Sequence, residues 1–559
     1  MTTTATTAPQ PWLPNYPQGV PAKIDADAYP TLLALLEDAM ARYRDRPAFT
    51  QMGKTLTYAE VDRDSTRFAA YLQQRGLEPG DRLALMSPNL LQYPIALFGA
   101  LKAGLIVVNT NPLYTPREML HQFTDSQVKG ILIAENFAAN LEKIIGQTQI
   151  KAVITTSIGE LLGFKGRIVN FAVRNVKRMV PKYNLPGAVI FKDALREGAR
   201  LQLKRHEGKP EDVIVHQYTG GTTGVAKGAM LTNRNLVANA TQVKAWMDPV
   251  LGKEQELVVL CPLPLYHIFA FTVNCLSMMT GGADVVLIVN PRDLSTVVKA
   301  FNDHPINVMT GINTLFNALA NSAEFARADT SHLKVVNAGG MALQNAVADR
   351  FRDVTGCAVV EGYGMTESSP VASTNPIDGT HRQGTIGLPI PSTLMRVVDE
   401  DYNPVPPGTV GEIQIQGPQV MKGYYNRPDE TAKTLRDGWL CTGDIGVMDE
   451  DGYFRIVDRK KDMVLVSGFN VFPNEVEDVL VSHPKVLEAA VIGVPDEKSG
   501  EVVKAFVVKR DKSLTEKELM AFCKEQLTGY KRPKYVEWRA ELPKSNVGKI
   551  LRKDLRSEG

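Results

Sequence analysis

Segments with helical spacing of apolar residues alternate with short β-rich segments along most of the 559 residues. Residues 58–76 and 90–104 have the helical spacing, whereas residues 82–88 and 105–109 have the composition of strands. Because strands that alternate with helices usually pair in parallel, this succession predicts a parallel α/β core. A chain of this length is too long for one hydrophobic core, so we expect at least two domains.

The composition of the sequence changes over residues 387–417. This stretch is rich in β-branched residues, glycine and proline, and it predicts a small β subdomain. Short strands and helices return after the charged stretch Asp458–Asp462. We therefore expect a loose N-terminal arm over residues 1–25 and a large domain of parallel α/β subdomains plus the β subdomain over residues 26–458. A small α+β domain is expected over residues 459–559.

The bulk properties exclude several classes of protein. The formal net charge is only +2 and no long basic run occurs, which argues against a nucleic-acid partner. The five cysteines form no CxxC pair and are typical of reduced residues in a cytoplasmic protein. The first residues lack the basic and apolar regions of a secretory signal, and no apolar run reaches transmembrane length.

Residues 161–182 contain six Lys or Arg and no acid, and they predict a basic amphipathic helix. One interpretation is a surface helix that packs on the core and leaves its basic face in water. The other is peripheral attachment to the inner face of a membrane. The predicted apolar side holds Leu161, Phe164, Ile168, Ala172, Val176 and Met179, and the opposite side holds Arg167, Arg174, Lys177 and Arg178.

A glycine- and threonine-rich loop follows the β-rich residues 212–217. Glycines let a backbone curl closely around phosphate oxygens, while N–H groups and threonine hydroxyls donate hydrogen bonds to them. The lysine is not followed by Ser or Thr, so the loop is not a Walker motif, and a mobile turn is the alternative interpretation. The predicted phosphate-binding residues are Tyr218, Thr219, Gly220, Gly221, Thr222, Thr223, Gly224, Val225, Ala226, Lys227 and Gly228.

This loop resembles the signature loop of the adenylate-forming superfamily, which comprises acyl-CoA synthetases, nonribosomal-peptide adenylation domains and beetle luciferases. Further motifs of that family follow in order: PLPLYHIFA, NAGGMAL, GYGMTESSP, TGD, DRKKD and PKSNVGK. Residues 437–461 and the stretch DMVLVSGFNVFPNEVEDVL are similar to bacterial long-chain fatty-acid–CoA ligases in particular. The resemblance covers nearly the whole chain after residue 25.

The resemblance implies a reaction that joins a carboxylate to the α-phosphate of ATP and then transfers the acyl group to coenzyme A. Gly339 and Gly340 would lie at the adenine edge, and Tyr363 would stack on the adenine. Thr366 would bind a phosphate. Glu367 would be the Mg²⁺ ligand, since magnesium is often held by one carboxylate with phosphate oxygens and water.

The same resemblance assigns the ribose and the mobile domain. Asp444 would accept hydrogen bonds from the ribose hydroxyls, and Arg459 would help to hold the ribose and phosphate. Lys549 would reach the carboxylate and the α-phosphate as the principal catalytic residue. Lys461 would be the hinge about which the small domain swings. Gly468 would line the tunnel for the pantetheine of CoA.

The acid-binding pocket is predicted around PLPLYHIFA. His267 matches the entrance of the pocket, although a core histidine is the alternative, and Phe271 matches an aromatic gate of some fatty-acid relatives. Residues 267–274 contain no acid that could hold the ammonium group of an amino acid, which favours an alkyl or aryl chain. No carrier-protein domain follows the small domain, so free CoA is the expected acceptor.

The sequence thus predicts a ligase with a long-chain fatty acid, ATP and CoA as substrates and Mg²⁺ as cofactor. Within enzymes, the alternatives are a medium-chain or aryl acid–CoA ligase and an acyl-AMP ligase that serves a separate carrier protein. A non-catalytic nucleotide-binding scaffold is the alternative from another class. Analogy with long-chain relatives also leaves a homodimer open.

Overall fold

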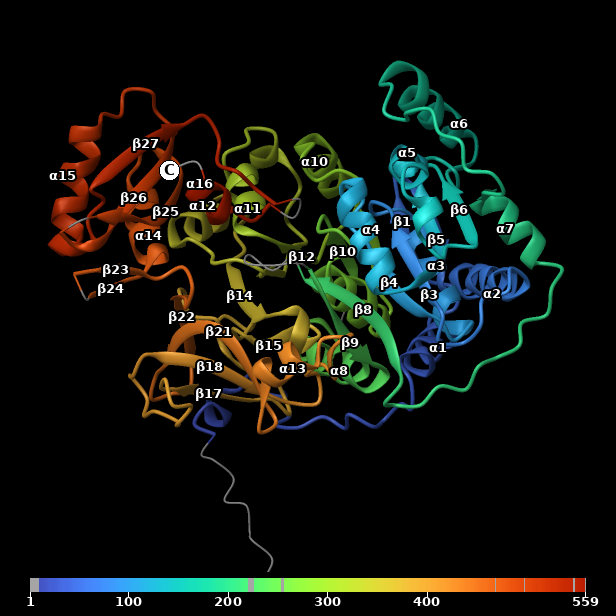
Figure 1. Cartoon of the computed structure of the whole chain (residues 1–559), viewed down its shortest axis with the longest axis horizontal. Coiled ribbons are helices and arrows are strands. Elements are labelled where there is room, and N and C mark those ends of the chain that lie inside the picture. The colour runs from blue at the N-terminus through green and yellow to red at the C-terminus, as the bar shows by residue number, and fades with distance from the viewer. Residues whose placement is uncertain are drawn as a thin grey trace, which may run out of the picture.

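The computed structural model describes residues 10–219, 226–252, 256–467, 469–496, 498–545 and 548–557. The described strands form two large sheets, a β subdomain and the sheet of a C-terminal domain (Figure 1). The prediction of an α/β fold with a small β subdomain and a small C-terminal domain is confirmed.

The first large sheet has a parallel core with an antiparallel edge. The six strands from β8 to β7 pair in parallel. At the other edge, β9 pairs antiparallel with β8, and β19 pairs antiparallel with β9. In order, the described strands are β19 (Gly423–Tyr424), β9 (Lys227–Thr232), β8 (Val213–Thr219), β4 (Ile106–Asn109), β3 (Arg82–Met86), β5 (Val128–Ala134), β6 (Ala152–Thr156) and β7 (Val189–Ile190).

The second large sheet is parallel from β14 to β1 and antiparallel at both edges. In order, its described strands are β16 (Leu388–Pro389), β15 (Val371–Thr374), β14 (Val359–Gly364), β13 (Val335–Ala338), β12 (Val308–Gly311), β10 (Val258–Cys261), β11 (Asp284–Leu287), β1 (Pro47–Gln51) and β2 (Lys54–Thr57).

Helices lie between the two sheets and on their outer faces. Side chains alternate across each strand, so Leu83 and Leu85 of β3 join the cluster between the sheets, while Ala84 and Met86 join an outer cluster. The inner helices are α1 (Leu32–Arg42), α2 (Tyr58–Gln74), α3 (Gln92–Lys102), α7 (Phe191–Gly198), α8 (Asn233–Leu251) and α9 (Met278–Thr280), with a π-helical segment over Ala270–Ser277. The outer helices are α4 (Pro116–Asp125) and α5 (Ala138–Glu142) on the first sheet and α10 (Leu294–Asp303), α11 (Asn313–Ala320) and α12 (Asn345–Thr355) on the second.

Local signals in the sequence explain where several of these helices begin. Thr57 accepts a hydrogen bond from the N–H of Glu60 while the Glu60 side chain accepts one from the N–H of Thr57, which closes a capping box before α2. Thr232 and Asn235 form the equivalent reciprocal pair before α8. These caps satisfy N–H groups that the first turn of a helix leaves without partners.

The β subdomain is an antiparallel sheet packed beside the second large sheet. Its described strands are β17 (Leu394–Val398), β18 (Gly411–Gln416), β20 (Leu435–Arg436), β21 (Trp439–Met448) and β22 (Phe454–Arg459). Helix α13 (Pro428–Thr434) connects β19 to β20. The predicted domain boundary at residue 458 lies within β22, and Lys461 follows in the turn that leads to the C-terminal domain.

The C-terminal domain has its own hydrophobic cluster. Strand β27 pairs in parallel with β26, and the other pairings of its sheet are antiparallel. The described elements are β23 (Val464–Val466), β24 (Phe469–Val471), α14 (Pro473–Ser482), β25 (Val486–Asp496), β26 (Gly500–Lys509), α15 (Glu516–Gln526), β27 (Tyr535–Arg539) and α16 (Arg552–Ser557).

The described part of the N-terminal arm is packed rather than loose. Trp12 is buried against Phe454 of the β subdomain, and the Tyr16 hydroxyl donates a hydrogen bond to the carbonyl of Pro389 (2.5 Å). Further along, the Ser392 hydroxyl accepts a hydrogen bond from the Ile24 N–H (2.9 Å). Burial of large aromatic side chains favours this ordered path despite the arm's Pro-rich composition.

The predicted helix over residues 161–182 is shorter and oriented differently. Helix α6 spans Gly163–Phe171 and continues as a π-helical turn to Val176. It is attached through a close backbone contact between Gly159 and Gly166, where a side chain would clash. The predicted apolar side mostly faces outward, so the expectation that this side packs on the core is wrong. Arg174, predicted on the solvated side, instead pairs with Glu135 (2.8 Å).

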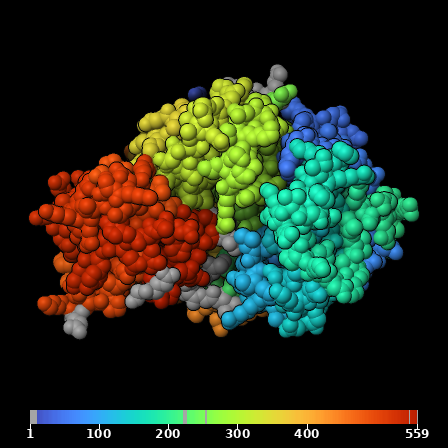
Figure 2. Space-filling model, turned by 90° about the horizontal axis from the view of Figure 1, so that it is seen from above, coloured from blue at the N-terminus to red at the C-terminus, as the bar shows by residue number. Residues whose placement is uncertain are grey.

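Two views place α6 and the C-terminal domain at opposite ends of the molecule (Figures 1 and 2). Across the described ranges, no helix has both the length and the apolar character needed to cross a membrane.

Candidate active site

A cavity of ≈ 1120 Å³ lies where β13 and β14 end, between the β subdomain and the C-terminal domain. Carboxyl ends of parallel strands are where ligands bind in open α/β sheets. Most predicted site residues in the described parts of the chain meet there. Those that line the cavity are Tyr218, Thr219, Lys227, His267, Gly339, Gly340, Tyr363, Thr366, Glu367, Asp444, Arg459, Lys461 and Lys549.

Asp444 is one of the buried carboxylates that line the cavity. The Tyr363 hydroxyl donates a hydrogen bond to Asp444 Oδ2 (2.6 Å), and Arg459 Nε lies 3.0 Å from Asp444 Oδ1. Strands β21 and β22 place Asp444 directly opposite Arg459 in register. Burial raises the pKa of Tyr363, so its hydroxyl keeps the proton that it donates. The carboxylate is thereby fixed in position and keeps lone pairs for further donors, such as a pair of ribose hydroxyls.

Lys549 reaches this region from the C-terminal domain. Its N–H donates a hydrogen bond to Ser545 Oγ (3.1 Å), and the Ser545 N–H donates one to the Lys549 carbonyl (2.7 Å). A Cβ on Gly340, which has φ +78°, would lie 3.6 Å from Lys549 Cε. Burial, and then the charge of Arg459, lower the pKa of Lys549 to about 8. The ammonium is therefore held in a desolvated place beside a second cation, a setting that favours an anionic ligand.

Gly548 lets the Lys549 loop approach the large domain. It has φ +80°, and a Cβ there would lie 2.6 Å from Ile312 Cδ1. The Thr314 hydroxyl donates a hydrogen bond to the Gly548 carbonyl (3.4 Å). These contacts fix the position of the Lys549 loop relative to α11 and so the place at which Lys549 enters the cavity.

Glu367 is buried beside the phosphate-loop region, and its partner was not predicted. The Tyr424 hydroxyl donates a hydrogen bond to Glu367 Oε1 (2.5 Å). Burial, and then the Glu367 charge, raise the pKa of Tyr424, so the phenol stays protonated. Lys227 Nζ lies 4.6 Å from the centre of the same ring and 2.9 Å from Glu430 Oε2. Tyr424 thus connects the predicted metal ligand with the predicted phosphate lysine.

The rest of the predicted phosphate loop is only partly described. Gly220, Gly221, Thr222, Thr223, Gly224 and Val225 lie outside the described residues, as does the predicted CoA-tunnel residue Gly468. The Tyr218 hydroxyl donates a hydrogen bond to Asp125 Oδ2 (2.6 Å), and Gly228 packs against the Tyr218 ring. The Ala226 carbonyl lies 3.1 Å from His121 Nε2. Ala226 and Gly228 do not line the cavity.

His267 lies on the cavity wall. Burial, and then the nearby Lys549 charge, lower the pKa of His267 to about 3, so the imidazole is neutral at physiological pH. Its Nδ1 accepts a hydrogen bond from the Phe269 N–H (3.4 Å), which leaves Nε2 to carry the proton. The ring can therefore donate a hydrogen bond to a carboxylate without adding charge.

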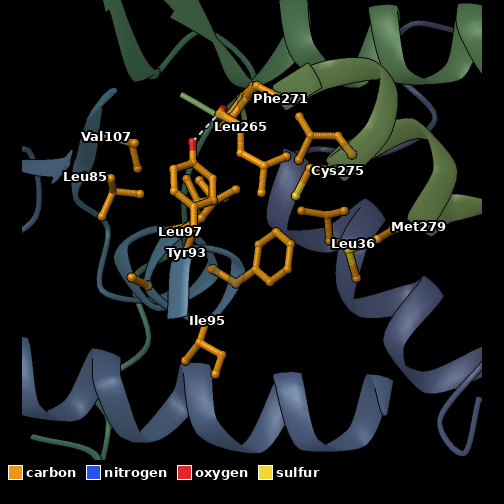
Figure 3. Close-up of a cluster of buried hydrophobic side chains, with 14 of the residues drawn as sticks. Leu36, Leu85, Tyr93, Ile95, Leu97, Val107, Leu265, Phe271, Cys275 and Met279 are labelled. Atoms are coloured by element: carbon orange, nitrogen blue, oxygen red, sulfur yellow. Dashed lines mark hydrogen bonds between the residues drawn. The ribbon is translucent and has the colours of Figure 1, made fainter. Parts of the chain in front are cut away.

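Phe271 does not occupy its predicted place on the acyl pocket. It is fully buried in the cluster between the sheets, where Figure 3 shows it together with Cys275, Tyr93 and Leu97. Phe269 and Val273 line the cavity instead. The π-helical segment begins at Ala270, so side-chain directions there differ from those of a regular α-helix. Phe269, which directly precedes this segment, therefore lines the cavity with an aromatic side chain in place of Phe271.

Known proteins match almost the whole chain. A family model described as AMP-binding enzyme matches residues 36–425, and one described as AMP-binding enzyme C-terminal domain matches residues 475–549. A long-chain-fatty-acid–CoA ligase of Escherichia coli O6:H1 is 56% identical over 549 residues, with 98% of each chain covered. The enzyme of that name from Bacillus subtilis is 40% identical over 552 residues, also covering 98% of each.

Solved structures agree in fold. ATP-bound MatB from Rhodopseudomonas palustris has a TM-score of 0.77 and 27% identity, covering 93% of this chain and 98% of its own. The anthranilate CoA ligase AuaEII, solved with anthranoyl-AMP, has a TM-score of 0.86 and 24% identity, covering 96% of this chain and 99% of its own. These matches and the family models confirm the resemblance inferred from the ordered motifs. The chain belongs to the family of AMP-binding enzymes.

Proposed function

We propose that this chain is an ATP-dependent long-chain fatty acid–CoA ligase. In the first half-reaction a carboxylate oxygen attacks the α-phosphorus of ATP and pyrophosphate leaves; in the second, the CoA thiol attacks the acyl carbon and AMP leaves. The observation that carries this proposal is the placement of Lys549, from the C-terminal domain, in one cavity with Asp444, Arg459 and Glu367. The substrate class is supported by relatives of that name at 50% and 56% identity.

The first half-reaction brings two anions together, so neutralisation of charge and alignment of the reacting atoms would supply most of the rate. Asp444 would hold the ribose, and Arg459 would bind both Asp444 and a phosphate oxygen. Lys549 would bridge the acid carboxylate and the α-phosphate. The neutral His267 would donate a hydrogen bond near the acid. Tyr363 would stack on the adenine, for which the glycines at residues 339–340 leave room.

The donor set fits Mg²⁺. In the described residues, no group of three or more His, Cys, Asp or Glu side chains could hold a metal alone, but Glu367 offers one hard oxygen ligand beside the phosphate-binding region. Magnesium commonly combines one or two carboxylates with substrate phosphates. When bound, it would offset charge on the phosphate oxygens. Thr366 would bind phosphate next to Glu367.

The second half-reaction would require the C-terminal domain to turn about Lys461 and withdraw Lys549 from the cavity. Lys461 lies exposed in the turn that follows β22 and borders the cavity, a place where the chain can change direction without breaking a packed core. Gly468 would then line the path of pantetheine. A homodimer stays a prediction.

A panel of acids tests the substrate class. Palmitate should give CoA-stimulated pyrophosphate release with kcat/KM at least about tenfold above that of octanoate or ferulate, because an apolar pocket gains free energy with each added methylene. The measurement is pyrophosphate release with and without CoA. A preference for ferulate would favour the aryl-acid alternative, which has support in a feruloyl-CoA synthase from Amycolatopsis sp at 36% identity. Turnover without CoA stimulation would favour an acyl-AMP ligase.

Lys549→Ala should separate the half-reactions. We expect ATP–pyrophosphate exchange to fall about 100-fold to 1000-fold, the usual loss when one charge-stabilising donor is removed from a transition state. Conversion of supplied acyl-AMP and CoA to acyl-CoA should stay near the wild-type rate. Lys512→Ala, at an exposed lysine of the same domain, is the matched control. Equal losses in both half-reactions would contradict the assignment of Lys549 to adenylation.

Tyr424→Phe should weaken the use of magnesium, because it removes the hydroxyl that orients Glu367 while the ring beside Lys227 is retained. We expect the Mg²⁺ concentration for half-maximal ATP–pyrophosphate exchange to rise about tenfold or more, as is typical when a partner of a metal ligand is lost. Mn²⁺ binding in the presence of a non-hydrolysable ATP analogue, followed by electron paramagnetic resonance, provides a readout apart from turnover. Tyr425→Phe is the adjacent control, and identical metal titrations for the two variants would refute the role.

We also propose that α6 attaches the protein to the surface of an anionic membrane. Five large apolar side chains on and after α6 are more than half exposed, an unusual arrangement on a surface that faces only water. Residues 161–182 carry no acid, and Arg174 alone of their basic residues has a described ion pair. Apolar side chains that enter the lipid, flanked by cations that attract its headgroups, characterise interfacial helices. The exposed apolar residues are Phe164, Ile168, Phe171, Val176 and Met179.

Charge reversal tests this attachment. The triple variant Arg167→Glu, Lys177→Glu and Arg178→Glu leaves the Arg174–Glu135 pair intact. Because each cation near an anionic surface contributes about 1 kcal/mol, binding to phosphatidylglycerol-containing vesicles should fall at least about 100-fold. Co-sedimentation with these vesicles and with pure phosphatidylcholine is the measurement. Unchanged binding of the triple variant would favour a helix that is merely solvated.

A further inference from the structure

The cavity has an apolar wall that the nucleotide chemistry does not use. Helix α8 presents Val243, Trp246 and Met247 to the cavity, at the i, i+3, i+4 spacing of one helix face. The π-helical region packed against α8 adds Phe269 and Val273. A run of apolar side chains beside the carboxylate-binding region is where the alkyl chain of a fatty acid would lie.

Trp246 is held in place by contacts with residues outside this wall. It is among the largest fully buried side chains, yet it also borders the cavity. Its indole N–H donates a hydrogen bond to the Asn375 carbonyl (3.1 Å). The Tyr16 ring meets it edge-on, with centroids 5.2 Å apart. A side chain held on two sides cannot turn aside to admit a longer ligand without breaking these contacts.

The N-terminal arm supplies this support. Tyr16 is itself held by the hydrogen bond from its hydroxyl to the Pro389 carbonyl, next to Ile390, which also lines the cavity. Gly19 passes beside Pro249 in the last turn of α8, where an added Cβ would lie 3.6 Å from the proline ring. The arm therefore contacts both the Trp246 ring and the end of the helix that carries it.

We infer that Trp246, braced by Tyr16, closes the acyl end of the cavity and sets the longest acyl chain that the enzyme accepts. This inference rests on the proposed function. It assigns a specificity-determining role to Trp246 and a positioning role to Tyr16. Neither residue belongs to the motifs by which the chain resembles its family.

The test compares Trp246→Leu with Phe271→Leu across an even-numbered series of saturated acids from octanoate to behenate. Trp246→Leu should raise the ratio of kcat/KM for behenate to that for palmitate about tenfold or more, because the site gains room for additional methylenes. The change should lie in KM for the acid, with KM for ATP unchanged. Phe271→Leu also removes a buried ring but borders only the core, so its chain-length profile should match the wild type.

Two further variants keep the inference testable if Trp246→Leu folds poorly. Trp246→Phe should shift the profile in the same direction by a smaller factor, and Val243→Phe should shift it toward shorter acids by filling the wall from the same helix face. An unchanged profile in Trp246→Phe and Val243→Phe, or a shift in Phe271→Leu alone, would overturn the inference. A wild-type enzyme that forms no acyl-CoA from any acid of the series would instead refute the proposed function.

Discussion

Thr314 of α11 donates a hydrogen bond to the carbonyl of Gly548, and this contact joins the loop that carries Lys549 to the large domain. Gly548 can make this approach because it has no side chain and a left-handed backbone. The next residue is Lys549, so the same contact brings an ammonium to Gly340. Without the docked loop the cavity would retain Asp444 and the strands that border it but lose the Lys549 cation.

Several cations of the cavity are already paired with carboxylates, and two of them are predicted nucleotide-binding residues. Arg459 faces Asp444, and Lys227 faces Glu430. Charged groups in a desolvated site are costly unless a partner or ligand compensates them. Lys549 is half-buried, and partial burial together with the Arg459 charge lowers its pKa, so an anionic ligand would stabilise this cation. Because Asp444 and Glu430 already hold the side chains of Arg459 and Lys227, the proposed binding of a triphosphate would require little rearrangement of these two cations.

The alternation of helix-like and strand-like segments was sufficient to predict the parallel core. Most of the described residues that the motifs predicted do line the cavity, because the motifs lie in short loops at strand ends that the sheets bring together. The motifs could not identify Tyr424, Glu430 or Asp125, whose roles depend on contacts between elements distant in the chain. The sequence also could not show that Phe271 is buried in the cluster between the sheets while Phe269 and Val273 line the cavity, because the π-helical course of this segment was not predicted. Of the two interpretations of residues 161–182, the one in which the apolar side packs on the core is wrong, because most of that side is exposed while a contact between two glycines helps to attach α6.

The separation of α6 from the C-terminal domain has a mechanical consequence (Figures 1 and 2). A surface that binds α6 contacts the protein beside the first large sheet, at the end remote from the Lys549 loop. The C-terminal domain then lies at the opposite end of the molecule and does not contact that surface. The turn of the small domain that we propose for the second half-reaction would then take place away from the surface that holds the protein.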